Sequence, residues 1–511
     1  MLALRDLRAL FCLLSLLACS PELPATSELP PEYAVACAED GPIDQAILPA
    51  EQAHAGQSGF RLVSDGTEAF ALRAQSAERA VRSLDVQTYI WHADLTGMAL
   101  AHALLEAADR GVRVRLLLDD MDARAKSAGL AALAAHPNVA VRLFNPFASR
   151  SGWLSKIHEG LWGFGRLNGR MHNKAWIADN RLALAGGRNL GDEYFQASEQ
   201  VNFVDLDFAM VGPVVRDVSA SFDRYWNAST VIPIELLSGG QLGAEQLQQL
   251  RVRLAAHARA ARQGRYAQAL RADDAVERMV SAGVSLNWAA NYRFVSDDPR
   301  KVTLAPRAEA RAHVAAVLEP VIARTQRELT IISPYFVPGA ATPQLARLAQ
   351  DGRRLRVLTN SLASNDVTAV HGGYARYRQP LLEAGVELWE LKRLSGGGDS
   401  SLLGSSGASL HTKAFAVDQR VLFVGSFNLD ARSTWLNCEQ GVLVESANLA
   451  RQLLLVFAEH TSAASAWRVG LREGALRWSA GEQSLDTEPG ASLARRVLAW
   501  ASGWLPLEPQ L

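Results

Sequence analysis

Two short motifs in the two halves of the chain share a histidine, a lysine two residues later and an aspartate seven residues after the histidine. They are His172, Lys174 and Asp179 in RMHNKAWIADNRLALAGGRN, and His411, Lys413 and Asp418 in SLHTKAFAVDQRVLFVGSFN. Seventeen residues after each histidine, a glycine-rich turn carries an asparagine, Asn189 or Asn428. One HxK pair arises easily by chance, but two extended copies strongly indicate a function.

These residue types suit the chemistry of a phosphodiester. Because a phosphodiester is an anion, attack on it needs cationic and hydrogen-bonding groups aimed at its oxygens, and the lysines, the asparagine amides and the Ser426 hydroxyl supply them. One imidazole can attack phosphorus and form a phosphohistidine, while the other donates a proton to the leaving alkoxide and then activates the incoming alcohol or water. Gly187 stands where the second copy has Ser426. We therefore expect an asymmetric phosphate site, in which the first turn offers only backbone donors.

Each imidazole also needs a partner on its other nitrogen to fix its tautomer. In the second motif, Glu439 lies eleven residues beyond Asn428. In the first, Asp205 and Asp207 alternate on one strand and share a face, so periodicity cannot choose between them. These three carboxylates are the candidates for the imidazole partners. The aspartates of the two HxK motifs are expected to hold local structure rather than to touch phosphate.

The same succession of strand, helix, strand and strand precedes each motif. It covers residues 83–91, 98–111, 112–120 and 139–144 in the first half, and 329–338, 342–352, 354–360 and 386–392 in the second. Strands that alternate with helices predict a parallel sheet flanked by helices. Two similar halves predict two such lobes packed face to face.

The paired motifs resemble the duplicated HKD motifs of the phospholipase D superfamily. Longer stretches, among them YIWHADLTG, GVRVRLLLDDM, FVDLDFAMVGPVV and GSFNLDARS, are similar to bacterial cardiolipin synthases of the C type. The resemblance runs from about Gly59 to the C-terminus. It implies an α/β fold of two pseudo-symmetric α-β-α-β-α sandwich lobes with the active site at their interface. It also implies that Glu439 is the partner of His411, and it favours Asp205 over Asp207 as the partner of His172. It favours His172 as nucleophile with His411 as acid/base, although the pseudo-twofold site makes the reverse assignment plausible.

The function that this resemblance implies is synthesis of cardiolipin, by transfer of a phosphatidyl group from a donor phospholipid to phosphatidylglycerol. It suggests phosphatidylethanolamine as the donor, a macrodomain protein as a helper, and metal-independent chemistry without a cofactor. Hydrolysis by water would instead give a phospholipase D. An exported nuclease is disfavoured because Lys+Arg number 52 against Asp+Glu 53, which leaves no basic footprint for nucleic acid. A membrane-anchored interaction protein with a decayed site would not need two intact motifs.

Residues 1–18 have the basic start and short apolar run of a secretory signal, and they end before Cys19 in a pattern that resembles a bacterial lipobox. We therefore expect a lipid anchor on Cys19, in the bacterial cell envelope and facing the periplasm from the outer membrane, because Ser20 is not the aspartate that favours the inner membrane. Further along the chain we expect a tether, a first lobe, a helical inter-lobe segment, a second lobe and a C-terminal segment, at residues 19–58, 59–240, 241–300, 301–470 and 471–511.

Three features are weaker candidates. His92 and His371 lie where an α/β sheet opens its ligand crevice, but each is as well explained as an ordinary satisfied or exposed histidine. The C-terminal segment carries Trp500 and Trp504 beside two arginines. It could lie on a membrane interface, or it could be a plain helix docked on the body. No set of histidine, cysteine or acidic residues has the spacing of a metal site.

Overall fold

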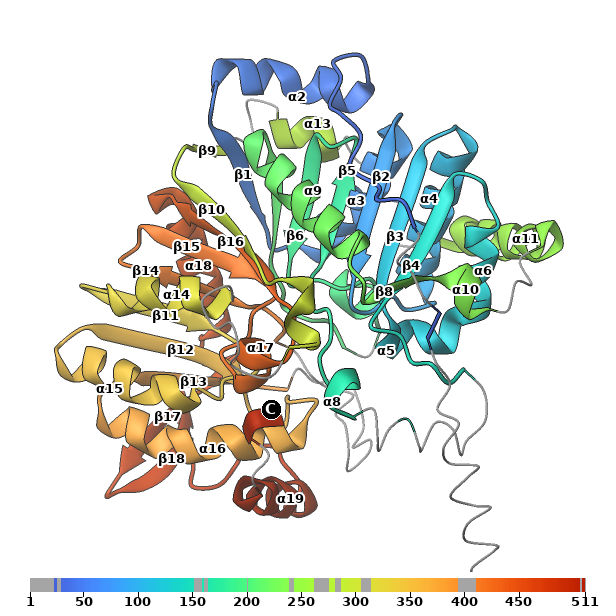
Figure 1. The fold of residues 1–511 in the computed structure, drawn as a ribbon. Helices are drawn as coiled ribbons and strands as arrows, with labels where there is room; N and C mark the ends of the chain where they lie inside the picture. The colour runs from blue at the N-terminus through green and yellow to red at the C-terminus, as the bar shows by residue number, and fades with distance from the viewer. Residues whose placement is uncertain are drawn as a thin grey trace, which may run out of the picture.

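A computed structural model describes residues 23–24, 29–150, 159, 164–199, 201–238, 243–261, 275–280, 286–304, 314–393, 410–505 and 508–510. Within these ranges the chain forms two α/β lobes, each built on one large sheet, that lie against each other (Figure 1). The α/β class and the two-lobe architecture expected from the sequence are confirmed. Among the described helices, none combines the length and the apolar character needed to cross a membrane.

The sheet of the first lobe has the strand order β8-β4-β3-β2-β5-β6-β7-β1-β9. Its strands are β1 Ser58–Val63, β2 Ser83–Thr88, β3 Arg113–Asp119, β4 Val139–Phe144, β5 Ala175–Ala178, β6 Leu182–Gly186, β7 Asp207–Val211, β8 Val231–Pro233 and β9 Asn287–Ala289. Only β2, β3 and β4 pair in parallel. The expected parallel sheet is thus mixed, because the strands that follow the histidine motif return as antiparallel neighbours.

The second lobe repeats this plan in the order β10-β16-β15-β14-β11-β12-β13-β17-β18-β19. Its strands are β10 Tyr292–Ser296, β11 Glu328–Ile332, β12 Arg354–Asn360, β13 Glu387–Leu391, β14 Ala414–Val417, β15 Val421–Gly425, β16 Gln440–Glu445, β17 Ala466–Arg472, β18 Ala475–Ala480 and β19 Gln483–Leu485. Here β11, β12 and β13 form the parallel core. Each predicted strand before a histidine motif is therefore present.

Helices cover both faces of each sheet. On the outer faces lie α3 Gly66–Arg79 with α4 Leu95–Asp109, and α14 Val314–Ala323 with α15 Thr342–Gln350. Between the sheets lie α9 Pro213–Trp226 and α18 Ala447–His460, whose apolar side chains share one buried core with strands of both lobes. This shared core fixes the lobes relative to each other, and the two histidine motifs approach each other at its edge.

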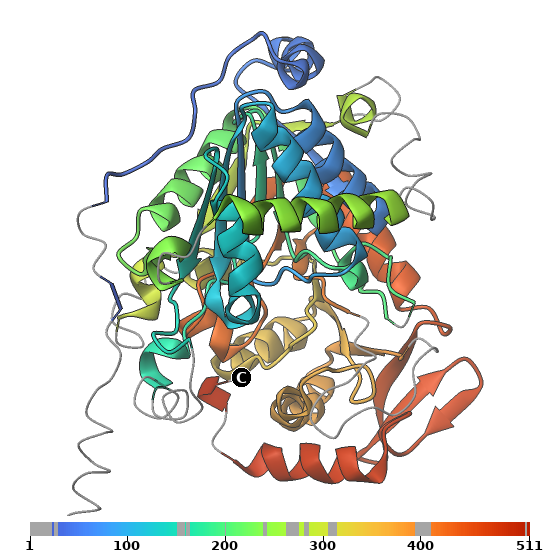
Figure 2. The same ribbon diagram turned by 90° about the vertical axis from the view of Figure 1, so that its right-hand side faces the viewer.

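The remaining helices surround this body. They are α2 Pro42–Ala53, α5 Asp120–Ala123, α6 Ser127–Ala134, α8 Phe164–Leu167, α10 Ile234–Leu237, α11 Ala244–Ala261, α13 Ala275–Val280, α16 Thr368–Glu383, α17 Ala431–Trp435 and α19 Leu493–Trp504. In two perpendicular views, α19 lies at the outer edge of the second lobe, beside α16 (Figures 1 and 2).

The structure changes three of the expected boundaries. The tether expected over 19–58 contains α2, which docks on the first lobe through buried Ile43 and Ile47. The inter-lobe segment expected to be helical over 241–300 contains β9, which closes the first sheet, and β10, which opens the second. The segment 471–511 contains β18 and β19, because the second sheet continues past residue 470. The signal over 1–18 and Cys19 lie outside the described residues.

Candidate active site

Short backbone pairings between the lobes bring the two histidines to the interface. Isolated parallel bridges join Met171 to Cys438 and Val204 to Leu410. At the first bridge the His172 amide donates to the Cys438 carbonyl over 2.8 Å, and at the second the His411 amide donates to the Val204 carbonyl over 2.9 Å. Each histidine is therefore held by the backbone of the opposite lobe.

The carboxylate that contacts each imidazole also comes from the opposite lobe. Nδ1 of His172 lies 2.9 Å from Oε2 of Glu439, and Nδ1 of His411 lies 2.6 Å from Oδ2 of Asp205. The pairing expected from the sequence, in which each carboxylate meets the histidine of its own motif, is therefore wrong. Because Glu439 follows Cys438 and Asp205 follows Val204, the bridges between the lobes deliver each carboxylate across the interface.

The choice of Asp205 over Asp207 agrees with these contacts. Asp207 is buried in an ion pair with Arg73, whose Nη2 lies 2.8 Å from its Oδ2, and Arg188 lies 3.5 Å away. Asp205 contacts His411 and accepts the amide of its neighbour Leu206. The two aspartates thus differ in role, since one orients an imidazole and the other neutralises buried arginines.

Ser426 serves the Glu439 carboxylate rather than a phosphate, which corrects its expected role. Its hydroxyl donates to Oε2 of Glu439 over 2.5 Å and accepts the Gln440 amide over 3.0 Å, and the side chain is fully buried. Ser433 donates to the other carboxylate oxygen over 3.0 Å. Both oxygens of Glu439 therefore accept hydrogen bonds in addition to the contact with the ring.

Gly187, at the matching position of the first lobe, makes room for Asp205. A Cβ at this position would lie 2.1 Å from Oδ1 of Asp205. Its amide donates to the Leu206 carbonyl over 3.0 Å and is not available to a phosphate. The expected asymmetry between the two turns is present, but it concerns how the carboxylates are held and not which donors face the substrate.

Lys174 and Lys413 supply positive charge between the histidines. Both are buried, and each Nζ donates to the carbonyl of the histidine two residues earlier, over 2.6 Å and 2.5 Å. Burial, together with the charge of the other lysine, holds the pKa of Lys174 well below its usual value, and burial lowers the pKa of Lys413 to about 8. Two buried ammonium groups this close together form an anion site.

Burial and the two lysines also hold the pKa values of His172 and His411 well below the usual histidine value. The imidazoles are therefore neutral at pH 7 in the free site. A neutral ring that donates from Nδ1 to a carboxylate presents the lone pair of Nε2, which is the form a nucleophile needs. Among the described residues, no hydrogen bond engages Nε2 of either ring, so both face the site.

The side-chain amides of Asn189 and Asn428 differ in their hydrogen bonds. Asn189 donates to the Tyr194 hydroxyl over 2.8 Å and accepts the Ile90 amide over 3.3 Å. The side-chain oxygen of Asn428 is buried without a hydrogen-bond partner in the described part of the chain. Of the pair, Asn428 is therefore the one whose amide can reorient toward a bound ligand, whereas Asn189 positions Tyr194.

Aromatic rings close around both histidines. Tyr89 meets His172 edge-on with ring centroids 5.3 Å apart, Tyr194 meets His411 edge-on at 5.2 Å, and Phe203 stacks on His411 at 5.4 Å. These contacts limit each ring to one orientation. They also exclude water from one side of it, which strengthens its electrostatic interactions.

Asp179 and Asp418 hold local structure. Each lies in the left-handed region, at φ 51° and φ 52°, after the strand that follows its histidine. Asp179 accepts the amides of Val81, Arg82 and Ser83 at the start of β2. Asp418 likewise accepts three amides, those of residues 326–328 at the start of β11. The aspartates thus join the histidine strand to the central strand of each sheet.

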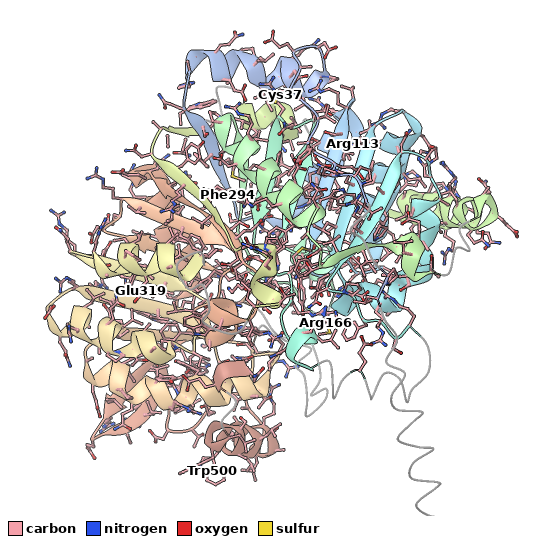
Figure 3. All side chains as sticks on the ribbon, viewed as in Figure 1. Cys37, Arg113, Arg166, Phe294, Glu319 and Trp500 are labelled. Atoms are coloured by element: carbon pink, nitrogen blue, oxygen red, sulfur yellow. The ribbon has the colours of Figure 1, made fainter. Side chains whose placement is uncertain are left out.

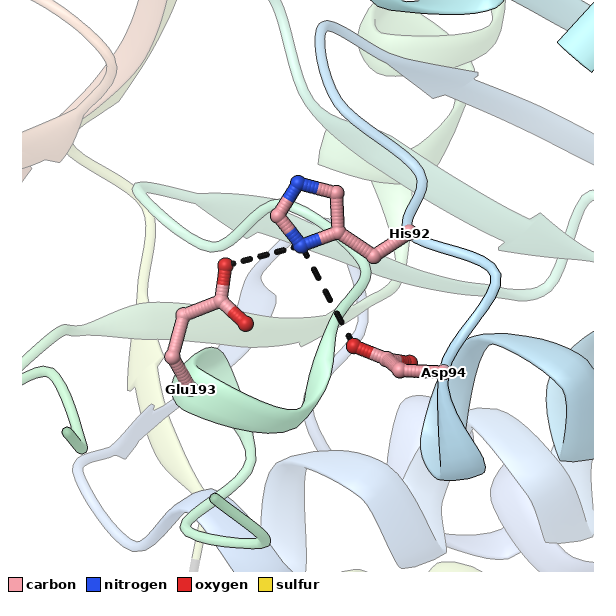
Figure 4. Close-up of side chains that lie close together, drawn as sticks. All are labelled: His92, Asp94 and Glu193. Atoms are coloured by element: carbon pink, nitrogen blue, oxygen red, sulfur yellow. Dashed lines mark ion pairs between the residues drawn. The ribbon is translucent and has the colours of Figure 1, made fainter. Parts of the chain in front are cut away.

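His92 and His371 lie in ion-pair networks. Nδ1 of His92 lies 3.0 Å from Glu193 and 4.0 Å from Asp94, so that it points between two carboxylates (Figure 4). Asp94 also caps α4 and accepts the Asp192 amide. The cluster therefore ties the loop before α4 to the turn that carries Tyr194. His371 is buried against Glu488 at 3.2 Å.

The comparisons with known proteins agree with this geometry. A family model described as "Cardiolipin synthase, PLD-like domain" matches residues 74–226 and 318–461, and each range contains one histidine motif. The chain is 41% identical over 473 residues to cardiolipin synthase C of Escherichia coli strain K12, across 91% of this chain and 98% of that one. It is 26% identical over 397 residues to cardiolipin synthase A of Pseudomonas putida, across 77% and 66%. The crystal structure of phosphatidylserine synthase from Haemophilus influenzae Rd KW20 has a TM-score of 0.56 over 91% of this chain and all of that one, at 13% identity, and so shares the fold.

Proposed function

Since the chain belongs to the phospholipase D-like family of cardiolipin synthases, we propose that it is a phosphatidyltransferase that makes cardiolipin. The observation that carries the proposal is the pair of neutral histidines, whose Nε2 atoms accept no hydrogen bond from any described residue, beside two buried lysines in a chain that covers 98% of cardiolipin synthase C. We take phosphatidylethanolamine as the donor and phosphatidylglycerol as the acceptor.

In the first half-reaction, Nε2 of His172 attacks the donor phosphorus and forms a P–N bond. In the bound complex, where the phosphodiester brings negative charge beside the ring, His411 takes up a proton at Nε2. It gives this proton to the departing alkoxide as the bond from phosphorus to the head-group oxygen breaks. Asp205 stabilises that imidazolium, and Glu439 stabilises the positive charge that the ring of His172 gains on phosphorylation. The two lysines offset the charge on the phosphoryl oxygens.

In the second half-reaction, a glycerol hydroxyl of phosphatidylglycerol replaces the head group. His411, now neutral, removes the hydroxyl proton, the oxygen attacks phosphorus, and the P–N bond to His172 breaks. The products are cardiolipin and the starting enzyme, with every proton returned to its position. If water took the place of the hydroxyl, the product would be phosphatidic acid, and the enzyme would be a phospholipase D.

Lipid mass spectrometry of a cardiolipin-null bacterium that expresses this chain tests the proposal. We expect cardiolipin to reappear, and to be absent when His411→Ala is expressed at the same level. Accumulation of phosphatidic acid without cardiolipin would show that water is the acceptor and would refute transfer.

We also propose that a lipid on Cys19 tethers the enzyme to the outer membrane, where it faces the periplasm. The lipobox-like run before Cys19 and the serine after it support this proposal. Cys19→Ser is expected to release the protein from sedimented membranes or to stall its processing, because the diacylglycerol supplies most of the membrane affinity. A variant that still sediments completely with membranes would show that another surface anchors the protein.

A further inference from the structure

A large cavity lies in the second lobe beside the candidate active site. It has a volume of about 580 Å³, within the roughly 300–1,000 Å³ range of sites for small molecules. Its walls are the outer face of the second sheet, the helices α14 and α15, and the turn that leads to α17. Most of its lining side chains are apolar, including Leu318, Ile322, Ile331, Phe415 and Phe423.

One end of the cavity lies beside the segments that carry Asn428 and Lys413. Phe427, Leu429 and Asp430 line it and flank Asn428, and Ala414 lines it directly after Lys413. A ligand in the cavity therefore lies next to two segments that also supply groups to the anion site.

The other end of the cavity lies next to α19. Arg376 and Glu508 line it there, and their side chains form an ion pair of 3.3 Å. The same Arg376 donates to the Gly503 carbonyl in α19 over 2.6 Å. The cavity thus extends from the segment around Asn428 to the helix at the edge of the lobe.

The pseudo-symmetry of the lobes explains why the cavity exists. The helix α15 has nine residues where its counterpart α4 has fifteen, and both end four residues before the next strand. The missing turns therefore come from the N-terminal end, which points toward the active site. In the second lobe the loop of residues 333–338 and a single 3-10 turn over Gly339–Ala341 stand in their place, and Gly339, Ala340 and Ala341 line the cavity.

The outer face of α19 is apolar and exposed. Leu493, Val497, Trp500 and Trp504 follow at spacings of four, three and four residues and are 75%, 54%, 67% and 77% exposed. The inner face packs tightly on α16, where a Cβ on Gly372 would lie 2.4 Å from the Ala499 carbonyl. Trp500 lies at the outer edge of the molecule (Figure 3). A helix with tryptophans on such a face is typical of the interface between membrane and water.

From these observations we infer that the cavity of the second lobe binds one acyl chain of a phospholipid substrate while the phosphodiester lies between His172 and His411. The outer face of α19 rests on the membrane from which the lipid comes. This inference rests on the proposed function, because it assigns a place to the chain of the lipid on which the histidines act. The loss of α15 turns provides the space, and the apolar lining excludes the head group.

Photocrosslinking tests the site without requiring turnover. The full chain carrying His172→Ala is mixed with vesicles of phosphatidylethanolamine and phosphatidylglycerol that contain a phosphatidylethanolamine with a diazirine in the middle of one palmitoyl chain. After irradiation, we expect the label on the peptides of α14 and α15. Label confined to α19 or to the first lobe would overturn the inference. Because the variant cannot complete transfer, labelling of α14 and α15 would stand even if the enzyme proved not to make cardiolipin.

A filled cavity gives a second, kinetic test. Ala315 lines the cavity on α14, and its neighbour Ala316 does not. Ala315→Trp is expected to raise KM roughly 60-fold for dipalmitoyl substrates, the equivalent of three excluded methylenes. KM for dihexanoyl substrates in the same detergent should change little, and Ala316→Trp should leave both values near those of the unmodified enzyme. An equal effect of Ala315→Trp on both chain lengths, or no effect on either, would overturn the inference.

Discussion

Replacement of Glu439 by glutamine tests the crossed pairing most directly. Glu439 is fully buried, and its carboxylate accepts from Nδ1 of His172 at 2.9 Å and from the hydroxyls of Ser426 and Ser433. Glutamine keeps the shape of the side chain but replaces one acceptor oxygen by an NH₂ donor. If the NH₂ group faces the ring, Nδ1 of His172 keeps only the Ser426 carbonyl, 3.0 Å away, as its acceptor and loses the carboxylate. Otherwise a hydroxyl must face a donor, or His172 must change its tautomer and lose the nucleophilic lone pair on Nε2.

The expected magnitude follows from these contacts. Exchanging a charge-assisted hydrogen bond for a neutral one costs about 1–2 kcal/mol, and a buried donor left without an acceptor costs about 1–3 kcal/mol more. A sum of about 2–5 kcal/mol slows formation of the phosphohistidine roughly 30-fold to 5,000-fold. The control is Glu445→Gln on the same strand, since Glu445 pairs with Arg420 at the surface, where such ion pairs contribute little.

The assay is rapid quenching of a single turnover, with mass spectrometry of the peptide that carries the phosphatidyl group on His172. Circular dichroism should show an unchanged fold in both variants. If Glu439→Gln forms the phosphohistidine within threefold of the normal rate, while Glu445→Gln behaves in the same way, then Glu439 does not orient the nucleophile and the reasoning fails.

Asp205 is expected to affect the rate at which His411 protonates the leaving group. Without the charge of Asp205, the pKa of His411 is lower still, so a smaller fraction of the enzyme carries the proton that the leaving group needs. Asp205→Asn should therefore slow a donor with an alkoxide leaving group about 10²-fold or more, and should have little effect on a p-nitrophenyl phosphodiester, whose leaving group needs no proton. Glu439→Gln should slow both donors equally. If instead Asp205→Asn slowed both donors and Glu439→Gln slowed only the donor with the alkoxide leaving group, His411 would be the nucleophile. Asp207→Asn should instead lower stability, because it breaks the buried pair with Arg73.

Three further predictions follow from the same site. His172→Ala and His411→Ala should each abolish turnover, and near-normal activity of either variant in a product assay would contradict the two-histidine mechanism. Inhibition by sulfate, which stays an anion throughout, should weaken as the pH rises through about 8, because Lys413 is charged below its lowered pKa of about 8 and neutral above it; an inhibition constant that is flat from pH 7 to 10 would refute this. Asp179→Asn should destabilise the first lobe by about 1–3 kcal/mol through its three amide contacts, as a lowered melting temperature with kcat retained; a lost kcat at unchanged stability would place Asp179 in the chemistry.

Most of the fold, and the histidines and lysines that meet at the candidate site, could be predicted from the sequence. The two copies of the motif predicted two lobes, and the alternating strands and helices predicted the parallel strands at the centre of each sheet. The sequence could not show which carboxylate meets which histidine, because that depends on bridges between segments more than 200 residues apart. Asp205 and Asp207 lie on the same face of a strand, so the sequence pattern cannot show which of them contacts a histidine. The structure distinguishes them because Asp207 pairs with buried arginines.

The role of Ser426 was mistaken for a related reason. A hydroxyl beside a histidine motif suits either a phosphate or a carboxylate, and the sequence does not show that Glu439 lies next to it in space. A usable signal was nevertheless present, because Gly187 replaces the serine in the copy where the shorter carboxylate of Asp205 occupies the same place. A difference between two repeats at one position can thus reveal a contact with a third residue.

The crossed pairs have a consequence for how the two halves of the chain work together. Each lobe holds a nucleophilic or acid/base histidine whose tautomer is set by the other lobe, and the same bridge that fixes the backbone of the histidine positions the carboxylate. A shift of one lobe relative to the other would therefore disturb both imidazoles at once. The shared core of α9 and α18 opposes such a shift because it buries apolar side chains from both sheets. The packing between the lobes is for this reason part of the catalytic apparatus, although none of its apolar side chains touches phosphate.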